Sequence, residues 1–209
     1  MDTIKVVAFD CDGVLFDTEQ ANRAYYNHIL TYFKRPVMTA EQFDYVHTHT
    51  LGEALAFLFD DEGSLEAAHA YRQTMDYRSF LPYMEMEPHL VRLLEKLRPR
   101  CKTAIATNRS DSMNRLLADF NLSAFFDLVV TSADIERPKP HPDALLKILT
   151  YFKIEPGQAI FIGDSELDEM AARSAGVPFV AYRNPTLSSP YHIQSLREVE
   201  NILTQGSEG

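Results

Sequence analysis

The sequence is poor in cysteine and has no long apolar run. It contains only two cysteines, Cys11 and Cys101, so no disulfide framework is implied, and this fits a reducing compartment. No stretch of 18 or more apolar residues occurs, which predicts that no helix crosses a membrane. Because no charged and apolar leader precedes the first apolar run, we expect a cytoplasmic protein.

Basic residues are also fewer than acidic residues. The 209 residues include 20 Lys and Arg against 30 Asp and Glu, which gives a formal net charge of -10. Nucleic acids and anionic membranes bind through cationic faces, so this balance argues against both as partners. An anionic substrate would need a local basic pocket. The length allows one domain with a full core plus a sizeable insertion.

The most informative segment is the apolar run at residues 6–9, which Asp10-Cys11-Asp12-Gly13 follows. In an extended chain the side chains at i and i+2 share a face, so Asp10 and Asp12 emerge together while Cys11 points away. Two carboxylates about 4 Å apart repel by roughly 1 to 4 kcal/mol. A shared proton, a divalent cation or a nearby Lys or Arg would offset this repulsion.

Short apolar runs alternate with segments of helical period along much of the chain. We expect helices from about Ser112, Asp143, Leu167 and His192. The alternation predicts an α/β fold, a Rossmann-like core with a parallel five-stranded sheet and helices on both faces. The expected strands lie around residues 6–9, 103–106, 128–130, 159–162 and 178–181.

The alternation stops between about residues 18 and 85, where the pattern indicates helices alone. Asp17-Thr18-Glu19-Gln20 has the spacing of a capping box at the start of the first of them, which ends near Pro36. Further helices are expected at 39–45, 52–59 and 64–80. We therefore predict a core formed by residues 1–17 and 86–209, with an α-helical insertion at 18–85.

Four motifs follow expected strands or lie between them, and together they cover nearly the whole chain. In this order and spacing they resemble the motifs of the haloacid dehalogenase-like hydrolases, a superfamily made up mostly of magnesium-dependent phosphatases. The helical insertion resembles the cap domain of the branch that contains phosphoglycolate phosphatases and β-phosphoglucomutases. The motifs are Asp10-Cys11-Asp12-Gly13-Val14, Thr107-Asn108, Lys139 within Arg137-Pro138-Lys139-Pro140, and Gly163-Asp164-Ser165-Glu166-Leu167-Asp168.

The resemblance implies roles for the four aspartates. Asp10 would be the nucleophile that forms an aspartyl-phosphate, and Asp12 the general acid and base. The dehalogenases of the superfamily lack this second aspartate, so its presence favours phosphoryl substrates. The implied cofactor is Mg²⁺, held by Asp10, Asp164 and the backbone carbonyl of Asp12, with Asp168 bound to the ion directly or next to a ligand.

The remaining motif residues would bind the transferring phosphoryl group. The resemblance assigns this to the Thr107 hydroxyl, the Asn108 backbone N–H and the Lys139 ammonium. Arg109 departs from the small or lysine residue often found after the Thr-Asn pair. It could contact a substrate phosphate or a carboxylate of the cap, or lie on the surface.

His47, His49 and Thr50 fall where the family carries a loop that selects substrate. We consider them candidates for substrate contact, with polar surface and metal binding as the alternative interpretations of the two histidines. The segment from His47 to Gly52 contains no Lys or Arg.

The sequence therefore predicts a Mg²⁺-dependent phosphatase that hydrolyses a small phosphorylated metabolite, such as a sugar phosphate or a phosphoglycolate-like compound. A phosphomutase of the β-phosphoglucomutase type is the first alternative. It is disfavoured because such an enzyme must hold a second phosphate with a basic cap loop, and the corresponding segment here contains no Lys or Arg. A non-catalytic sensor of phosphorylated ligands is the second alternative. The oligomeric state is left open.

Overall fold

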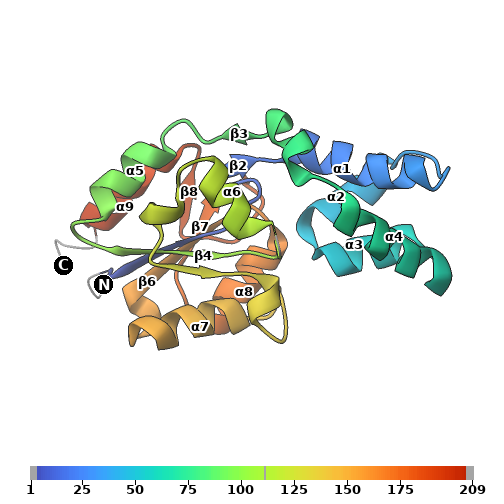
Figure 1. Cartoon of the computed structure of the whole chain (residues 1–209). Helices are drawn as coiled ribbons and strands as arrows, with labels where there is room; N and C mark the ends of the chain where they lie inside the picture. Colours follow the sequence, from blue (N-terminus) through green and yellow to red (C-terminus); the bar gives the residue numbers. More distant parts are fainter. Residues whose placement is uncertain (1–3, 111, 206–209) are drawn as a thin grey trace. The chain divides into compact units, whose positions relative to one another are not determined.

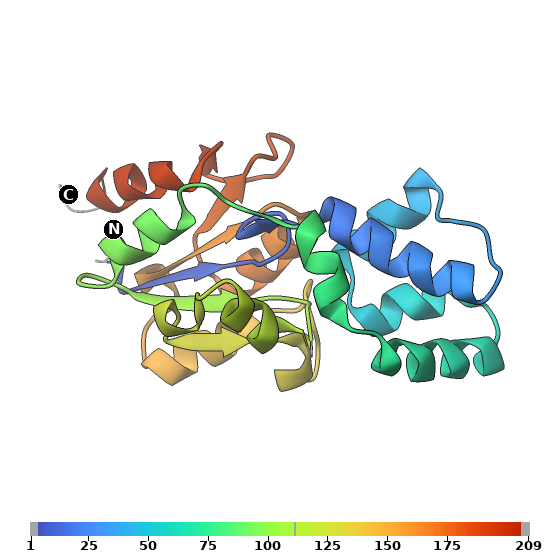
Figure 2. The ribbon, with the colours of Figure 1, turned by 45° about the horizontal axis from the view of Figure 1, so that its top comes forward.

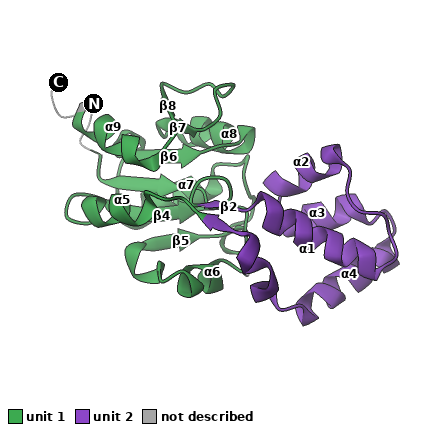
Figure 3. Ribbon diagram, turned by 90° about the horizontal axis from the view of Figure 1, so that it is seen from above, with its two compact units in different colours: residues 1–15, 86–209 green, residues 16–85 purple. Residues whose placement is uncertain are grey.

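The computed structural model describes residues 4–110 and 112–205, which divide into two compact units (Figure 3). The first unit comprises the described residues up to Leu15 and from Met86 onward, and the second runs from Phe16 to Glu85. Within the described part of the chain, every helix is too short or too polar to cross a membrane.

The first unit is built on a parallel sheet of six strands (Figure 1). Each neighbouring pair in the sheet is parallel. The strand order is β5 (Leu128–Val130), β4 (Lys102–Ala106), β1 (Val6–Phe9), β6 (Ala159–Gly163), β7 (Phe179–Tyr182) and β8 (Tyr191–Ile193).

Strand β1 lies at the centre, between β4 and β6. Val6 is paired with Lys102 on one side and with Ala159 on the other. All four of its residues are buried, as expected for an apolar strand with helices on both faces of the sheet. The chain beyond Phe9 therefore emerges at the middle of the sheet's carboxyl edge.

Helices cover both faces of this sheet (Figures 1 and 2). Two of them pack on one face, where Leu145 and Ala171 join Ala8 and Phe161 in a continuous apolar core. They are α7 (Asp143–Phe152) and α8 (Glu166–Ala175). The opposite face carries α5 (Leu90–Leu97), α6 (Met113–Asp119) and α9 (Val199–Gln205).

The α/β class and the parallel sheet are confirmed, but the expected number of strands is wrong. Strand β8 is a sixth strand, paired with β7 from Tyr191 to Ile193. The sequence pattern predicted a helix from about His192, whereas α9 begins only at Val199. A strand of three residues is too short to show a period of two against the helical pattern that follows it.

Between the strand residues at its two ends, the second unit is helical: α1 (Glu19–Tyr32), α2 (Ala40–Thr48), α3 (Leu51–Leu58), α4 (Glu62–Thr74) and the 3-10 helix η1 (Tyr77–Tyr83). The single helix expected over 64–80 is wrong, because α4 ends at Thr74 and Met75 is extended. Asp76 then starts η1 by accepting a hydrogen bond from the Arg78 N–H. The expected capping box at residues 17–20 is also wrong, since Thr18 makes no side-chain cap and Asp17 accepts from the Glu19 N–H at 3.1 Å.

The chain passes between the two units through two short strands that pair with each other, β2 (Phe16–Asp17) and β3 (Glu85–Met86). Just beyond β3, the Glu87 N–H donates to the Leu15 carbonyl at 3.0 Å. The Glu87 carboxylate is buried and accepts from the backbone N–H groups of His89 and Leu196 at 2.6 and 3.2 Å. The returning chain is thus fixed to the first unit where it re-enters.

Candidate active site

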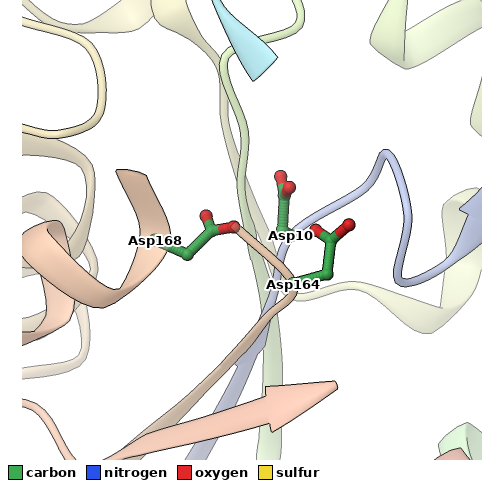
Figure 4. Close-up of side chains that lie close together, drawn as sticks. All are labelled: Asp10, Asp164 and Asp168. Carbon is green, nitrogen blue, oxygen red and sulfur yellow. The ribbon is translucent and has the colours of Figure 1, made fainter. Parts of the chain in front are cut away.

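Three carboxylates converge at the carboxyl edge of the sheet (Figure 4). Asp10 follows the central strand β1, Asp164 follows β6, and Asp168 lies on α8. One oxygen from each carboxylate lies within 4.8 Å of the others. Parallel strands end at a common edge, so topology alone brings together groups that are far apart in the sequence.

Lys139 lies among these carboxylates. Its Nζ is 2.8 Å from Asp10 Oδ1 and 2.6 Å from Asp168 Oδ1, and the side chain is only 4% exposed. A buried ammonium needs charged partners, and here two carboxylates share it. The lysine is therefore part of the site and not a solvated loop residue.

Asp168 is fully buried, and both of its oxygens are used within the protein. Oδ1 accepts from Lys139, while Oδ2 accepts from the Ser165 N–H at 3.1 Å and from its hydroxyl at 2.6 Å. Ser165 and Asp168 form the capping box of α8. The structure thus places Asp168 as the group that holds Lys139 in position.

The cluster carries more negative charge than Lys139 compensates. Burial raises the pKa of Asp10 to about 7; Lys139 opposes this, whereas Asp168 and Asp12 add to it. Burial also raises the pKa of Asp164 well above its usual value, with further contributions from Asp168 and Asp10. Burial alone would lower the pKa of Lys139, but its two carboxylate partners outweigh this and raise it. An additional cation at this edge would stabilise the ionised carboxylates.

The carboxylate cluster fits a hard divalent cation such as Mg²⁺. Such an ion prefers oxygen ligands and usually takes one or two carboxylates, together with waters and substrate oxygens. Since Asp168 is engaged by Lys139 and Ser165, Asp10 and Asp164 are the carboxylates best placed to bind it. The uncompensated charge described above is the observation that favours such an ion here.

Two glycines allow this close approach. Gly13 has a φ of +80°, and a Cβ at this position would lie 2.0 Å from Asp164 Oδ2. A Cβ on Gly163 would lie 2.4 Å from the Asp168 Cβ. Both positions therefore require glycine, the first for its backbone conformation as well as for space.

Asp12 is not part of the carboxylate cluster. Its carboxylate forms a two-pronged ion pair with Arg109, whose Nη2 and Nε lie 2.5 and 3.2 Å from Oδ1 and Oδ2. The Arg109 side chain is 7% exposed, and its Nη1 donates to the Ser112 hydroxyl at 3.1 Å. Of the positions considered for Arg109 from the sequence, a surface location is wrong. Its pairing with Asp12 was not foreseen, since no local pattern joins residues so far apart in the chain.

Thr107 and Asn108 are buried at the end of β4. The Thr107 N–H donates to the Val130 carbonyl at 3.1 Å, and its hydroxyl accepts from the Arg109 N–H at 3.1 Å. The Asn108 side chain forms two hydrogen bonds with the backbone of Lys139. Sequence reasoning considered only the Asn108 backbone and missed this side-chain role.

The three insertion residues proposed for substrate contact belong to the second unit and have partners there. His47 Nδ1 lies 3.1 Å from Asn22 Nδ2. His49 Nδ1 lies 2.8 Å from the Tyr45 carbonyl, and its ring stacks on Tyr45 at 3.8 Å. Thr50 is the N-cap of α3.

Comparison with known proteins links this arrangement to one family. A model of the haloacid dehalogenase-like hydrolase family matches residues 7–182. The pyrophosphatase PpaX of Bacillus cereus is 29% identical, over 85% of this chain and 82% of the relative. The crystal structure of a HAD-superfamily hydrolase of subfamily IA, variant 1, from Geobacter sulfurreducens is 41% identical with a TM-score of 0.79, covering 96% of this chain and 97% of the other.

A β-phosphoglucomutase from Clostridium difficile superposes with a TM-score of 0.84 and covers 98% of this chain and 99% of its own. It is 16% identical, so this likeness concerns the fold alone.

Proposed function

Because this chain belongs to the haloacid dehalogenase-like hydrolase family, we propose that it is a Mg²⁺-dependent phosphatase that acts through an aspartyl-phosphate on Asp10. The supporting observation is the setting of Asp10. Its buried carboxylate lies at the end of the central strand, 2.8 Å from Lys139 Nζ, in a cluster with Asp164. This arrangement provides a nucleophile, a fixed cation and oxygen ligands for a metal.

The substrate class is a small phosphorylated metabolite. Similar proteins include pyrophosphatases, so inorganic pyrophosphate belongs in this class together with sugar phosphates and phosphoglycolate-like compounds. The two free cysteines of the chain are compatible with a reducing compartment, and we infer a cytoplasmic location.

In the first step an Asp10 oxygen attacks phosphorus, and the bond between phosphorus and the bridging oxygen breaks. Asp12, which takes up a proton from solvent when its ion pair with Arg109 opens, gives that proton to the departing oxygen. Lys139 and the Thr107 hydroxyl bind the phosphoryl oxygens, so the charge that develops on them is met by groups already in place. In the second step Asp12 takes a proton from water, which attacks the aspartyl-phosphate and releases phosphate and Asp10.

When bound by Asp10, Asp164 and the Asp12 carbonyl, Mg²⁺ would neutralise carboxylate charge and bind a phosphoryl oxygen. Asp168 holds Lys139, and the Ser165 hydroxyl and N–H hold Asp168. We also propose that residues 16–85 act as a cap domain that selects substrate, with His47, His49 and Thr50 as contact candidates. The supporting observation is that these residues form a separate compact unit, inserted directly after the Asp10 motif.

Release of inorganic phosphate with Mg²⁺ tests the proposal. The panel should contain pyrophosphate, phosphoglycolate, sugar phosphates and nucleotides, with Asp10→Asn as the inactive variant and Asp44→Asn, an exposed acid on α2, as the matched control. Turnover that Asp10→Asn abolishes and Asp44→Asn keeps would support the phosphatase. Conversion of β-glucose 1-phosphate to glucose 6-phosphate without phosphate release would indicate a mutase instead. Binding of these compounds without any turnover would indicate a sensor.

A further inference from the structure

We propose that Arg109 determines specificity at this site by holding Asp12 until a second anionic group of the substrate replaces that carboxylate. The inference rests on the proposed function and narrows its substrate class. The preferred substrates carry a second phosphate or a carboxylate on the leaving group. The geometry of the Arg109–Asp12 pair is the starting point.

Arg109 is held at the site from several sides. Its N–H donates to the Thr107 hydroxyl, and its carbonyl accepts from the Ser132 N–H at 3.2 Å. The guanidinium contacts both Asp12 and the Ser112 hydroxyl and is nearly buried. The side chain is therefore a fixed part of the site, and a charge fixed in this way can discriminate between ligands.

The position of the guanidinium follows from that of Asp12. Asp10 attacks one side of the phosphorus, and Asp12 must approach the bridging oxygen to protonate it. The part of the substrate attached to that oxygen consequently extends towards Asp12 and the group that Asp12 contacts. That group is Arg109, with two nitrogens at hydrogen-bond distance from the Asp12 oxygens.

An anionic group of the substrate can replace Asp12 on Arg109 because both bind a guanidinium in the same way. The planar fork of a guanidinium binds a carboxylate or a phosphate in the same two-pronged way. A substrate with a second anion can take the place of Asp12 on Arg109, so the buried cation keeps a charged partner and Asp12 becomes available to the bridging oxygen. A substrate with a neutral leaving group offers no such replacement. Moving Asp12 would then separate two nearly buried charges, which is unfavourable.

Lys139, by contrast, lies where it can bind only the phosphoryl group that is transferred. It lies between Asp10 and Asp168, at the point of nucleophilic attack. The two cations therefore have different roles: Lys139 binds the transferred phosphoryl group, and Arg109 binds the anionic group of the leaving group.

Kinetics of matched substrates test this division. Phosphate release should be measured with Mg²⁺ for pyrophosphate and 2-phosphoglycolate, which carry a second anion, and for ethyl phosphate, whose leaving group is neutral. The variants are Arg109→Gln, which removes the charge, and Arg109→Lys, which keeps the charge but not the fork. Arg92→Gln, on the exposed side of α5, is the matched control. Circular dichroism establishes that each variant is folded.

We expect Arg109→Gln to lower kcat/KM for at least one anionic substrate tenfold or more, mainly through KM. It should leave kcat/KM for ethyl phosphate unchanged or higher, because no ion pair then opposes the movement of Asp12. Arg109→Lys should show an intermediate loss, and Arg92→Gln no loss. A loss confined to pyrophosphate or to phosphoglycolate would identify which anion Arg109 binds. Equal proportional losses on all three substrates, or no loss on any, would overturn the inference.

A binding measurement keeps this test separate from that of the proposed function. In the Asp10→Asn background, titration calorimetry in the presence of Mg²⁺ with pyrophosphate and with 2-phosphoglycolate should show at least tenfold weaker binding of at least one of them when Arg109→Gln is added. Unchanged affinity for both would refute the role of Arg109 even if turnover were lost. If the wild-type protein releases no phosphate from any substrate, the phosphatase proposal fails, and this titration still decides whether Arg109 binds the anion.

Discussion

Asn108 and Lys139 are joined by a reciprocal pair of hydrogen bonds. Asn108 Nδ2 donates to the Lys139 carbonyl at 3.0 Å, and the Lys139 N–H donates to Asn108 Oδ1 at 2.9 Å. Both residues are buried. The amide therefore fixes the backbone that carries the lysine, while Asp10 and Asp168 fix the other end of its side chain. Lys139 is held at both ends.

Replacing this amide should displace the lysine. We expect Asn108→Ala to lower the free energy of unfolding by about 1 to 3 kcal/mol, because two buried backbone groups lose their partners. Phosphate release should fall at least tenfold, since Lys139 is no longer held beside Asp10. Chemical denaturation and steady-state kinetics measure the two effects. Asn114→Ala, on the exposed side of α6, is the control and should leave both unchanged.

Magnesium should raise the thermal stability of the protein. An ion that binds only the folded state at 100 times its Kd adds about 2.7 kcal/mol. We expect a rise in Tm with added Mg²⁺ that a chelator reverses, together with loss of activity in the chelator. Asp164→Asn should abolish the Mg²⁺-dependent rise, and Asp44→Asn should retain it. A full response to Mg²⁺ in Asp164→Asn would refute the assigned ligand.

Gly13 and Gly52 form a matched pair for substitution by alanine. Gly13→Ala places a Cβ against the Asp164 carboxylate at a positive φ, whereas a Cβ on Gly52 meets nothing within 4 Å. The first should cost about 1 to 3 kcal/mol from backbone strain alone and should abolish the Mg²⁺-dependent rise in Tm. The second lies within α3 and should stabilise by about 0.5 to 1 kcal/mol. Equal effects of the two variants on Tm would contradict this account.

The stability of the fold should depend on pH through Asp127. Burial acts to raise the pKa of this carboxyl, but hydrogen bonds from Lys102 and the Thr103 N–H outweigh it and lower the pKa. The folded state therefore binds this proton less readily than the unfolded state, so the stabilisation is fully present above the unfolded pKa of about 4. It is lost as the pH falls through the lower folded pKa.

Urea denaturation of wild type and Asp127→Asn should accordingly show a constant difference from pH 8 to about pH 5, and a shrinking one below about pH 4. Asp44→Asn controls for the loss of one negative charge. A difference that grows on acidification would show that Asp127 does not stabilise the fold in its ionised form.

Much of the core could be predicted from the sequence because its strands are buried on both faces. Continuous apolar runs such as Ala159–Gly163 predict such strands, and their alternation with helices predicts a parallel sheet. Strand β8 was not predicted because three residues are too few to show an alternating pattern. The end of α4 was not predicted because Asp76, which starts the next helix, follows an extended residue and not a glycine or proline.

The positions of the carboxylates at strand ends could also be predicted from the sequence, since the topology of the sheet determines them. The hydrogen-bond and ion-pair partners of the side chains could not be predicted. Arg109 and Asp12 meet only because β4 lies beside β1, and which of several acids the guanidinium contacts depends on loop geometry. The bond between Ser165 and Asp168 could have been found, because Ser-x-x-Asp after a strand is the spacing of a capping box.

The central position of β1 also has a kinetic consequence. Asp10 can reach Lys139 and Asp164 only after residues 6–9 have paired with β4 and β6, both of which lie far along the chain. Pairings between distant segments form slowly, because the loss of chain entropy precedes the contacts that compensate for it. The proposed metal and phosphate ligands therefore assemble with the slowest part of the sheet. Recovery of Mg²⁺ binding during refolding should lag behind the formation of helical structure.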